Sequence, residues 1–202
     1  MFSTGRRIRG LAAILATASV FFIAVQPVAA ANTTFGTKLD ASTEFPDNAY
    51  PGTYCDHLLT GGSGTSSCTW ILVLPDKGTQ PTAPKDGKIN KIKLIAGKGG
   101  SFTLYIAQKS GSKFKVVTKG PKITYATDAC SPDCHIQSFS ISPITVHKGD
   151  YLAVKTAKAS FVRCNSGSQA TALFKPPLAT GGGFATPTDY DGCRMMLQAV
   201  YK

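Results

Sequence analysis

Glutamate and arginine are scarce in this 202-residue sequence. Glu44 is the only glutamate beside ten aspartates, and lysine far outnumbers arginine among the 22 basic residues. Because helical proteins usually draw on Glu, Leu and Ala, this composition argues against an all-α fold. The shortage of glutamate also weakens the case for hydrolysis of glycosides by paired carboxylates. The shortage of arginine weakens the case for a nucleic-acid partner, since bidentate arginine contacts are preferred there.

The sequence has few signs of an enzyme. It contains no Gly-x-Ser-x-Gly nucleophile elbow and no Cys-x-x-Cys redox pair. The histidines His57, His135 and His147 each lie beside a turn or a cysteine, where solvated loop histidines are common. The balance favours a protein that is not an enzyme. The alternative is a hydrolase, acting on a glycan or an ester, that uses Asp189, Asp191 or a histidine.

The first thirty residues have the three parts of a secretory signal peptide. Arg6, Arg7 and Arg9 precede an uncharged run from Leu11 to Val25, and small residues follow up to Ala30. The run has 15 residues, whereas a helix that spans a bilayer needs roughly 20. We therefore expect cleavage near Ala30 and secretion, with an uncleaved anchor as the alternative. Loss of the three arginines lowers the net charge from +11 to +8, and no second apolar stretch of membrane length follows.

Six cysteines in an exported chain predict a disulfide framework. Many connectivities are possible, and the sequence alone does not choose among them. The spacing favours three local pairs, which are Cys55–Cys68, Cys130–Cys134 and Cys164–Cys193. The alternative is a zinc site formed by Cys130, Cys134, His135 and another histidine. It is weakened because no second cysteine or histidine pair lies at ligand spacing and because exported thiols oxidise.

Short runs rich in Val, Ile, Thr, Phe and Tyr recur from Ser67 onward, separated by Gly, Pro and Asp turns. In residues 101–109, for example, Phe102, Leu104 and Ile106 alternate with more polar neighbours, as one face of a strand does. No helical period persists after the signal, so the strands should pair antiparallel. The pattern predicts an all-β, antiparallel two-sheet β-sandwich, jelly-roll-like and stapled by disulfides.

We expect the sandwich core to cover residues 67–202. Residues 31–66 read as an extended N-terminal segment that packs on the core, with one edge strand near Phe35 to Leu39. The Gly120-Pro121 pair predicts a break between two strands.

Lysines fall opposite the apolar faces of several predicted strands, with two tyrosines interleaved. If these strands share a sheet, one outer face carries many ammonium groups and could bind an anionic polymer, while tyrosines can stack on sugars. The alternative is a solvated face that keeps the surface soluble. The candidate ligand-binding residues are Lys91, Lys93, Tyr105, Lys113, Lys115, Lys122, Tyr151 and Lys155.

A calcium site is a further candidate, and no other cofactor is expected. Asp189-Tyr190-Asp191-Gly192 could bind calcium through two carboxylates and backbone carbonyls. The same residues could equally form a polar turn before Cys193.

The order of features resembles that of secreted bacterial proteins of the kind found in soil actinobacteria, which carry one β-sandwich and no assigned activity. The resemblance spans roughly residues 35–201. It rests on Phe35-Gly36, Cys68-Thr69-Trp70, Ile92 to Gly97, Val146 to Asp150 and the closing run Cys193 to Val200. It implies a jelly-roll-like sandwich and an extracellular protein, and it supplies no catalytic residues.

The expected function is therefore non-catalytic binding outside the cell, of a carbohydrate or an anionic wall polymer. A structural or surface protein with a protein partner is an alternative beside the hydrolase. The sequence does not indicate the oligomeric state.

Overall fold

The computed structural model describes residues 33–39, 53–55, 66–74, 80–128, 134–159, 161–163 and 169–202. Every regular element in these residues is a β-strand, and every pairing between strands is antiparallel. The all-β, two-sheet antiparallel prediction is thus confirmed, while jelly-roll connectivity stays a prediction. The expected signal peptide, residues 1–30, lies outside the described residues.

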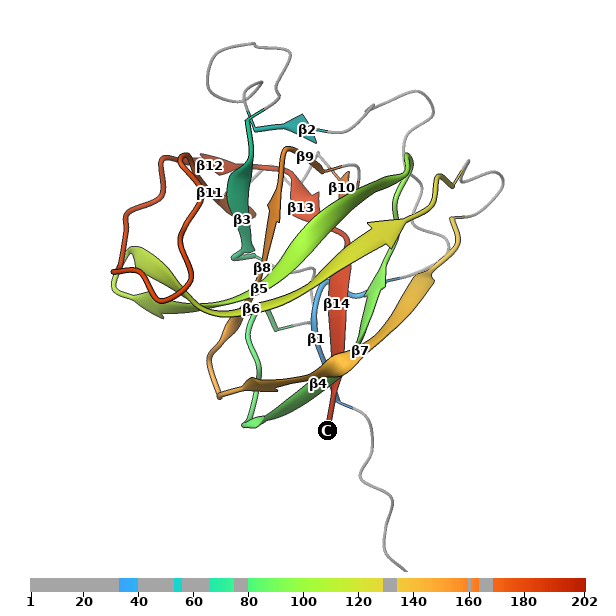
Figure 1. Ribbon diagram of the computed structural model, residues 1–202, viewed down its shortest axis with the longest axis horizontal. Coiled ribbons are helices and arrows are strands. Elements are labelled where there is room, and N and C mark those ends of the chain that lie inside the picture. Colours follow the sequence, from blue (N-terminus) through green and yellow to red (C-terminus); the bar gives the residue numbers. More distant parts are fainter. Residues whose placement is uncertain are drawn as a thin grey trace, which may run out of the picture.

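The larger sheet has six strands, and the long hairpin of its last two crosses the front of Figure 1. In spatial order it contains β12 (Asp189–Asp191), β11 (Thr171–Phe174), β3 (Cys68–Leu72), β8 (Tyr151–Thr156), β5 (Gly100–Ser110) and β6 (Lys113–Tyr125). The near-continuous apolar run of β3 is buried throughout, which agrees with its place inside the sheet.

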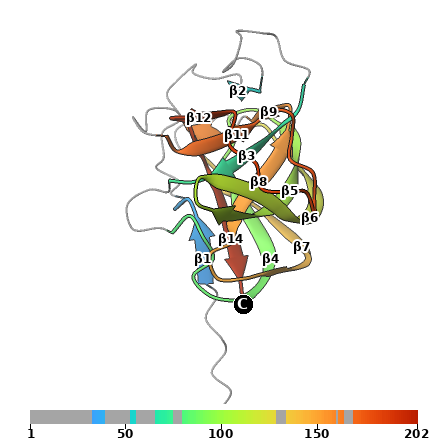
Figure 2. The same cartoon turned by 90° about the vertical axis from the view of Figure 1, so that its left-hand side faces the viewer.

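The smaller sheet has four strands, in the order β1 (Thr33–Gly36), β14 (Leu197–Tyr201), β4 (Gly87–Leu94) and β7 (Gln137–Val146). Figure 2 shows β1, β14 and β4 side by side below the strands of the larger sheet. Two short pairs complete the described strands: β10 (Val162–Arg163) with β13 (Arg194–Met195), and β2 (Thr53–Tyr54) with β9 (Lys158–Ala159).

The main core lies between the two sheets. Phe102, Leu104 and Ile106 of β5 are buried in it, as their alternation predicts. From the smaller sheet, the ring of Phe35 packs edge-on against that of Tyr201, with centroids 5.5 Å apart. Residues from both sheets are thus removed from water together, which is the main stabilising contribution in such a fold.

A second apolar cluster lies on the outer face of the six-stranded sheet. It contains Phe114 and Val116 of β6 and is packed by residues of the segment 175–188. This segment is held to β6 by bridges from Phe114 to Ala185 and from Val116 to Thr180. One half of the outer face is therefore covered by the protein's own chain.

Strand β6 runs without interruption through Gly120-Pro121, where the sequence predicts a break. The strand is the outermost of its sheet, so the N–H that Pro121 lacks is not needed by a further neighbour. The register with β5 shifts at this point, between Thr103 and Tyr105. The Gly-Pro pair therefore makes a bulge rather than a turn.

The edge strand predicted near Phe35 to Leu39 is β1, and it begins at Thr33. It pairs with β14 from Thr33–Tyr201 to Gly36–Gln198. Part of the segment 31–66 therefore forms the edge strand of the smaller sheet.

The disulfide Cys55–Cys68 is present, as predicted. Cys134 and Cys193 are also disulfide-bonded, which argues against thiolate ligation of zinc at Cys134. The partners that the spacing predicts for them, Cys130 and Cys164, lie outside the described residues.

Candidate ligand-binding pocket

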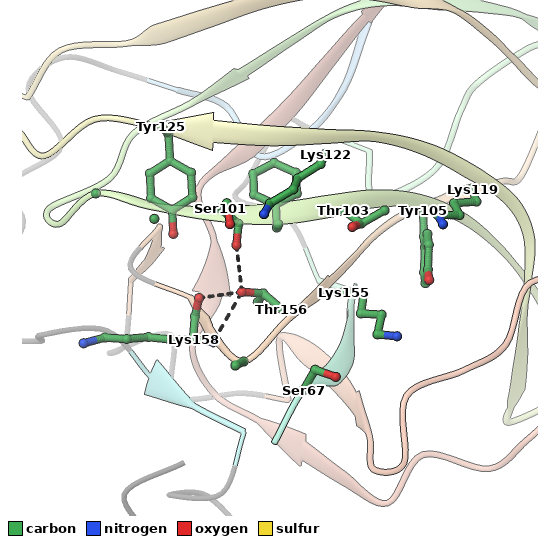
Figure 3. Close-up of a pocket in the computed structure, with 14 residues that line it drawn as sticks. Ser67, Ser101, Thr103, Tyr105, Lys119, Lys122, Tyr125, Lys155, Thr156 and Lys158 are labelled. Atoms are coloured by element: carbon green, nitrogen blue, oxygen red, sulfur yellow. Dashed lines mark hydrogen bonds between the residues drawn. The ribbon is translucent and has the colours of Figure 1, made fainter. Parts of the chain in front are cut away.

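A pocket of about 420 Å³ opens on the half of the outer face that segment 175–188 leaves uncovered. We call it the basic pocket (Figure 3). Its volume is within the range of about 300–1,000 Å³ that is usual for small-molecule sites. Strands β5, β6 and β8 supply most of its wall, and its lining residues are Ser67, Gly99, Gly100, Ser101, Phe102, Thr103, Tyr105, Lys119, Lys122, Tyr125, Lys155, Thr156, Ala157 and Lys158.

Three of the lysines are brought together by the register of β5 with its two neighbours. Thr103 pairs with Lys122 of β6 on one side and with Lys155 of β8 on the other, and Tyr105 pairs with Lys119. Residues paired across strands point to the same face of a sheet. Because neighbouring strands lie about 4.8 Å apart, the backbones of Lys122 and Lys155 are separated by about 10 Å.

These three lysines have no counter-ion in the described part of the chain. Lys119, Lys122 and Lys155 form neither an ion pair nor a side-chain hydrogen bond with any described residue. No carboxylate is among the residues that line the pocket. The described carboxylates accept hydrogen bonds elsewhere, as Asp86 does from Lys148 N–H and Asp150 from His147 N–H. The pocket therefore carries a net positive potential.

Tyr105 lies where the covered half of the outer face meets the pocket. Its side chain is 5% exposed and belongs to the second apolar cluster. Its hydroxyl has no hydrogen-bond partner among the described residues, and Figure 3 shows it below β5 at the side of Lys155. A ring fixed by packing thus presents a hydroxyl that can donate to a ligand.

The wall between β5 and β9 is held by the hydroxyl of Thr156. This oxygen lies 3.0 Å from the carbonyl oxygen of Ser101 and 2.8 Å from that of Lys158, and either can accept its proton. It also accepts the N–H of Lys158 at 3.3 Å (Figure 3). These contacts fix the path of the chain where β8 ends.

The aromatic residues Phe102, Tyr125 and Phe161 pack together behind the pocket. Phe102 and Phe161 have ring centroids 5.0 Å apart, and Tyr125 lies 5.5 Å from Phe161. A Cβ at Gly100 would lie 2.6 Å from the Tyr125 hydroxyl oxygen, so glycine is required for this ring to occupy its place. The back of the pocket is therefore closely packed.

The predicted ligand residues do not all share one face. Tyr105, Lys122 and Lys155 line the basic pocket, whereas Lys91 and Lys93 belong to β4 of the other sheet. Strands that carry alternating lysines need not be neighbours, and here β4 pairs with β7 and β14.

Three further candidates also lie outside the pocket. Lys113 and Lys115 project from β6 on the side opposite Phe114, with the Lys115 ammonium 4.8 Å from the centroid of the Phe184 ring. The ring of Tyr151 packs edge-on against Phe114 in the second apolar cluster, and burial raises the pKa of its hydroxyl.

Sequence reasoning missed Lys119 and Lys158. Lys119 was missed because Gly120-Pro121 predicts a break between two strands, which places the preceding lysine in a turn. A lysine on each side of Gly120-Pro121 is the signal that could have indicated it. Lys158 belongs to a two-residue strand, β9, that has no periodicity to detect.

The two aspartates proposed for calcium lie on β12. Asp191 is 9% exposed. Its Oδ1 accepts the N–H of Cys193 at 2.9 Å, while its Oδ2 has no hydrogen-bond partner among the described residues. Burial raises the pKa of this carboxyl and the charge of Asp189 adds to the rise, against the lowering effect of N–H groups from Cys193 and Gly192. In the described residues no group of three or more candidate ligands surrounds a metal position, and calcium stays a prediction.

The two described histidines contact aspartates in turns. His135 Nδ1 lies 3.2 Å from Asp128 Oδ1, and the His135 N–H donates to the same carboxylate. His147 N–H donates to Asp150 Oδ2 at 2.8 Å, which closes the turn before β8. Neither histidine lines the basic pocket. His57 lies outside the described residues.

No protein-family model, curated protein or solved structure matches the chain. No helix in the described part of the chain is long and apolar enough to cross a membrane. The pocket's own chemistry is therefore the basis for assigning a function.

Proposed function

We propose that this protein is an extracellular binding protein for an acidic polysaccharide, which it holds in the basic pocket. The observation that carries the proposal is the group of Lys119, Lys122 and Lys155, side by side and without a described counter-ion. Such ammonium groups attract carboxylates or sulfates and gain from pairing with them.

The hydroxyl groups of the pocket favour a sugar as the bearer of the negative charge. Ser67, Ser101, Thr103 and Tyr105 all line it, and a hydroxyl both donates and accepts hydrogen bonds, as the hydroxyls of a sugar do. No arginine is among the lining residues, so the bidentate recognition typical of nucleic acids is not available there.

The extracellular part of the proposal rests on the predicted signal peptide and is compatible with the disulfides. Cys55–Cys68 is formed, and disulfides persist in oxidising compartments. Detection of the mature protein, cleaved near Ala30, in the culture medium tests this part separately.

The proposal is for binding rather than hydrolysis. The lining of the basic pocket contains no carboxylate, imidazole or thiol. Hydrolysis of glycosides uses a pair of carboxylates, and hydrolysis of esters an activated nucleophile with its base. The groups that are present can position an anion.

The test is retention on immobilised polymers. Polygalacturonate and dextran sulfate supply carboxylates and sulfates, dextran supplies neutral sugars, and single-stranded DNA supplies a non-sugar anion. We expect retention on at least one acidic polysaccharide and none on dextran. In the pocket variant K119Q/K122Q/K155Q, affinity should fall by about three- to 150-fold, since each of three exposed pairs contributes about 0.2–1 kcal/mol.

The matched control is K85Q/K113Q/K148Q, which removes the same charge at exposed residues outside the pocket. It should bind within about twofold of the wild type. Equal losses in both variants, or a preference for DNA over both acidic polysaccharides, contradict the proposal. Release of reducing sugar from either polysaccharide would favour the hydrolase instead.

A further inference from the structure

A second basic surface lies on the outer face of the four-stranded sheet. Lys91 pairs with Val200 on one side and Ser140 on the other, and Lys93 pairs with Gln198 and Ser138. We call this set of six residues the β4 surface. Like the basic pocket, it combines ammonium groups with side chains that form hydrogen bonds to sugars.

The β4 surface has its own hollow and no described counter-ion. A depression of about 210 Å³ is lined by Asn90, Lys91, Ser140, Val200 and Lys202. Lys91 and Lys93 are half-buried along their stems and form no ion pair with a described carboxylate. These ammonium groups are thus not neutralised by the described residues.

The β4 surface and the basic pocket point in opposite directions. Lys91 and Lys93 flank Ile92, while Lys122 and Lys155 lie next to Ile123 and Val154, and all three apolar residues are buried in the one core between the sheets. Successive side chains of a strand point to opposite faces. The two sets of lysines therefore leave the core on opposite sides, beyond two sheets about 10 Å apart.

We infer that the protein bridges two acidic polysaccharide chains, one in the basic pocket and one on the β4 surface. A single extended chain segment cannot lie on both outer faces of a sandwich at once. A monomer with two such faces cross-links polymers and binds a dense polymer matrix with avidity. The inference rests on the proposed function. It assigns one polymer chain to the basic pocket and another to the β4 surface.

The experiment is a two-step capture. Protein is bound to the immobilised acidic polysaccharide that retains it, polygalacturonate or dextran sulfate. Excess protein is washed away, and the same polysaccharide in fluorescent soluble form is passed over it. Light scattering first establishes that the protein is monomeric, since an oligomer could bridge with one site per copy. We expect the wild type to capture the second polymer. The variant K91Q/K93Q should bind the first polymer within about twofold of the wild type but capture at least about fivefold less of the second.

The matched control is K85Q/K148Q, which removes two exposed charges outside both sites and should capture as the wild type does. The inference is overturned if K91Q/K93Q captures as much of the second polymer as the control does. It is also overturned if wild-type protein that saturates the first polymer captures none of the second. In both of these results the first polymer still binds, so the proposed function survives. Failure to bind both polygalacturonate and dextran sulfate refutes the proposed function itself.

Discussion

Lys122 and Lys155 are cross-strand partners of the same residue, Thr103, one on each side of β5. Thr103 therefore lies between the two lysines, with no described carboxylate in the pocket. Two like charges on the same face, with one strand between them, repel each other weakly when no anion neutralises them. An anionic ligand relieves this repulsion. The lysine pair therefore indicates an anion-binding site more specifically than the overall positive charge does.

Replacing Tyr105 by Phe separates ligand binding from packing. The ring is buried and should remain so, while the hydroxyl that faces the pocket is lost. We expect the free energy of unfolding to change by less than about 0.5 kcal/mol. The affinity for the acidic polysaccharide should fall about three- to tenfold, as for the loss of one hydrogen bond. Paired denaturant and binding titrations check this, and an unchanged affinity would remove Tyr105 from the site.

Replacing Phe161 by Ala tests the aromatic group behind the pocket. Phe161 is fully buried and contacts the rings of Phe102 and Tyr125. We expect a loss of about 3–5 kcal/mol in urea unfolding, because a cavity is left in a close-packed core. The affinity should also fall, since Tyr125 lines the pocket. A loss below about 1 kcal/mol would contradict the close packing of these three rings.

Removal of the Cys55–Cys68 disulfide by C55A/C68A should lower stability by about 3 kcal/mol, as expected for a loop of this length. The sulfur of Cys55 also accepts the indole N–H of Trp70 at 3.4 Å and lies 3.0 Å from the Thr156 carbonyl oxygen. A shift of the Trp70 fluorescence in the native state should therefore accompany the loss. An unchanged denaturation midpoint together with unchanged Trp70 emission would show that the disulfide contributes little to stability.

Asp191 should make stability depend on pH. Because burial raises its pKa in the folded state, the folded protein binds this proton more tightly than the unfolded chain does. The contribution of this proton to the stability of the fold is complete at pH values below the ordinary pKa of about 3.8. It is lost as the pH rises through the raised pKa of the folded state.

Replacing Asp191 by Asn removes the charge and keeps an acceptor for the N–H of Cys193. We expect a higher Tm than the wild type at about pH 7 and a difference that shrinks toward zero near about pH 3. The measurement is thermal unfolding in EDTA, on protein whose mass is checked for deamidation. A Tm difference of equal size at both pH values would contradict the assignment.

The alternation of side chains along single strands was predictable from the sequence. Which strands pair with one another was not. Phe102, Leu104 and Ile106 were placed on one face correctly, because a period of two is a local property. Whether Lys91 and Lys122 share a sheet depends on pairings between residues far apart in the chain. Composition and alternation carry no information on that choice.

The candidate site was predicted in part for the same reason. Tyr105, Lys122 and Lys155 lie on regular strands and were found, whereas Lys119 lies at the bulge that Gly120-Pro121 introduces. A Gly-Pro pair indicates a turn in most contexts. Only the position of β6 at the edge of its sheet lets the strand continue through it.

The most direct test of the account is the salt dependence of binding to polygalacturonate, measured for the wild type and for K119Q/K122Q/K155Q. If the three lysines contact the polymer, their loss must both weaken binding and flatten the plot of log Kd against log salt. The slope should fall by up to about one for each lysine. Equal slopes and equal affinities for the two proteins would show that the acidic polysaccharide is not bound by these lysines.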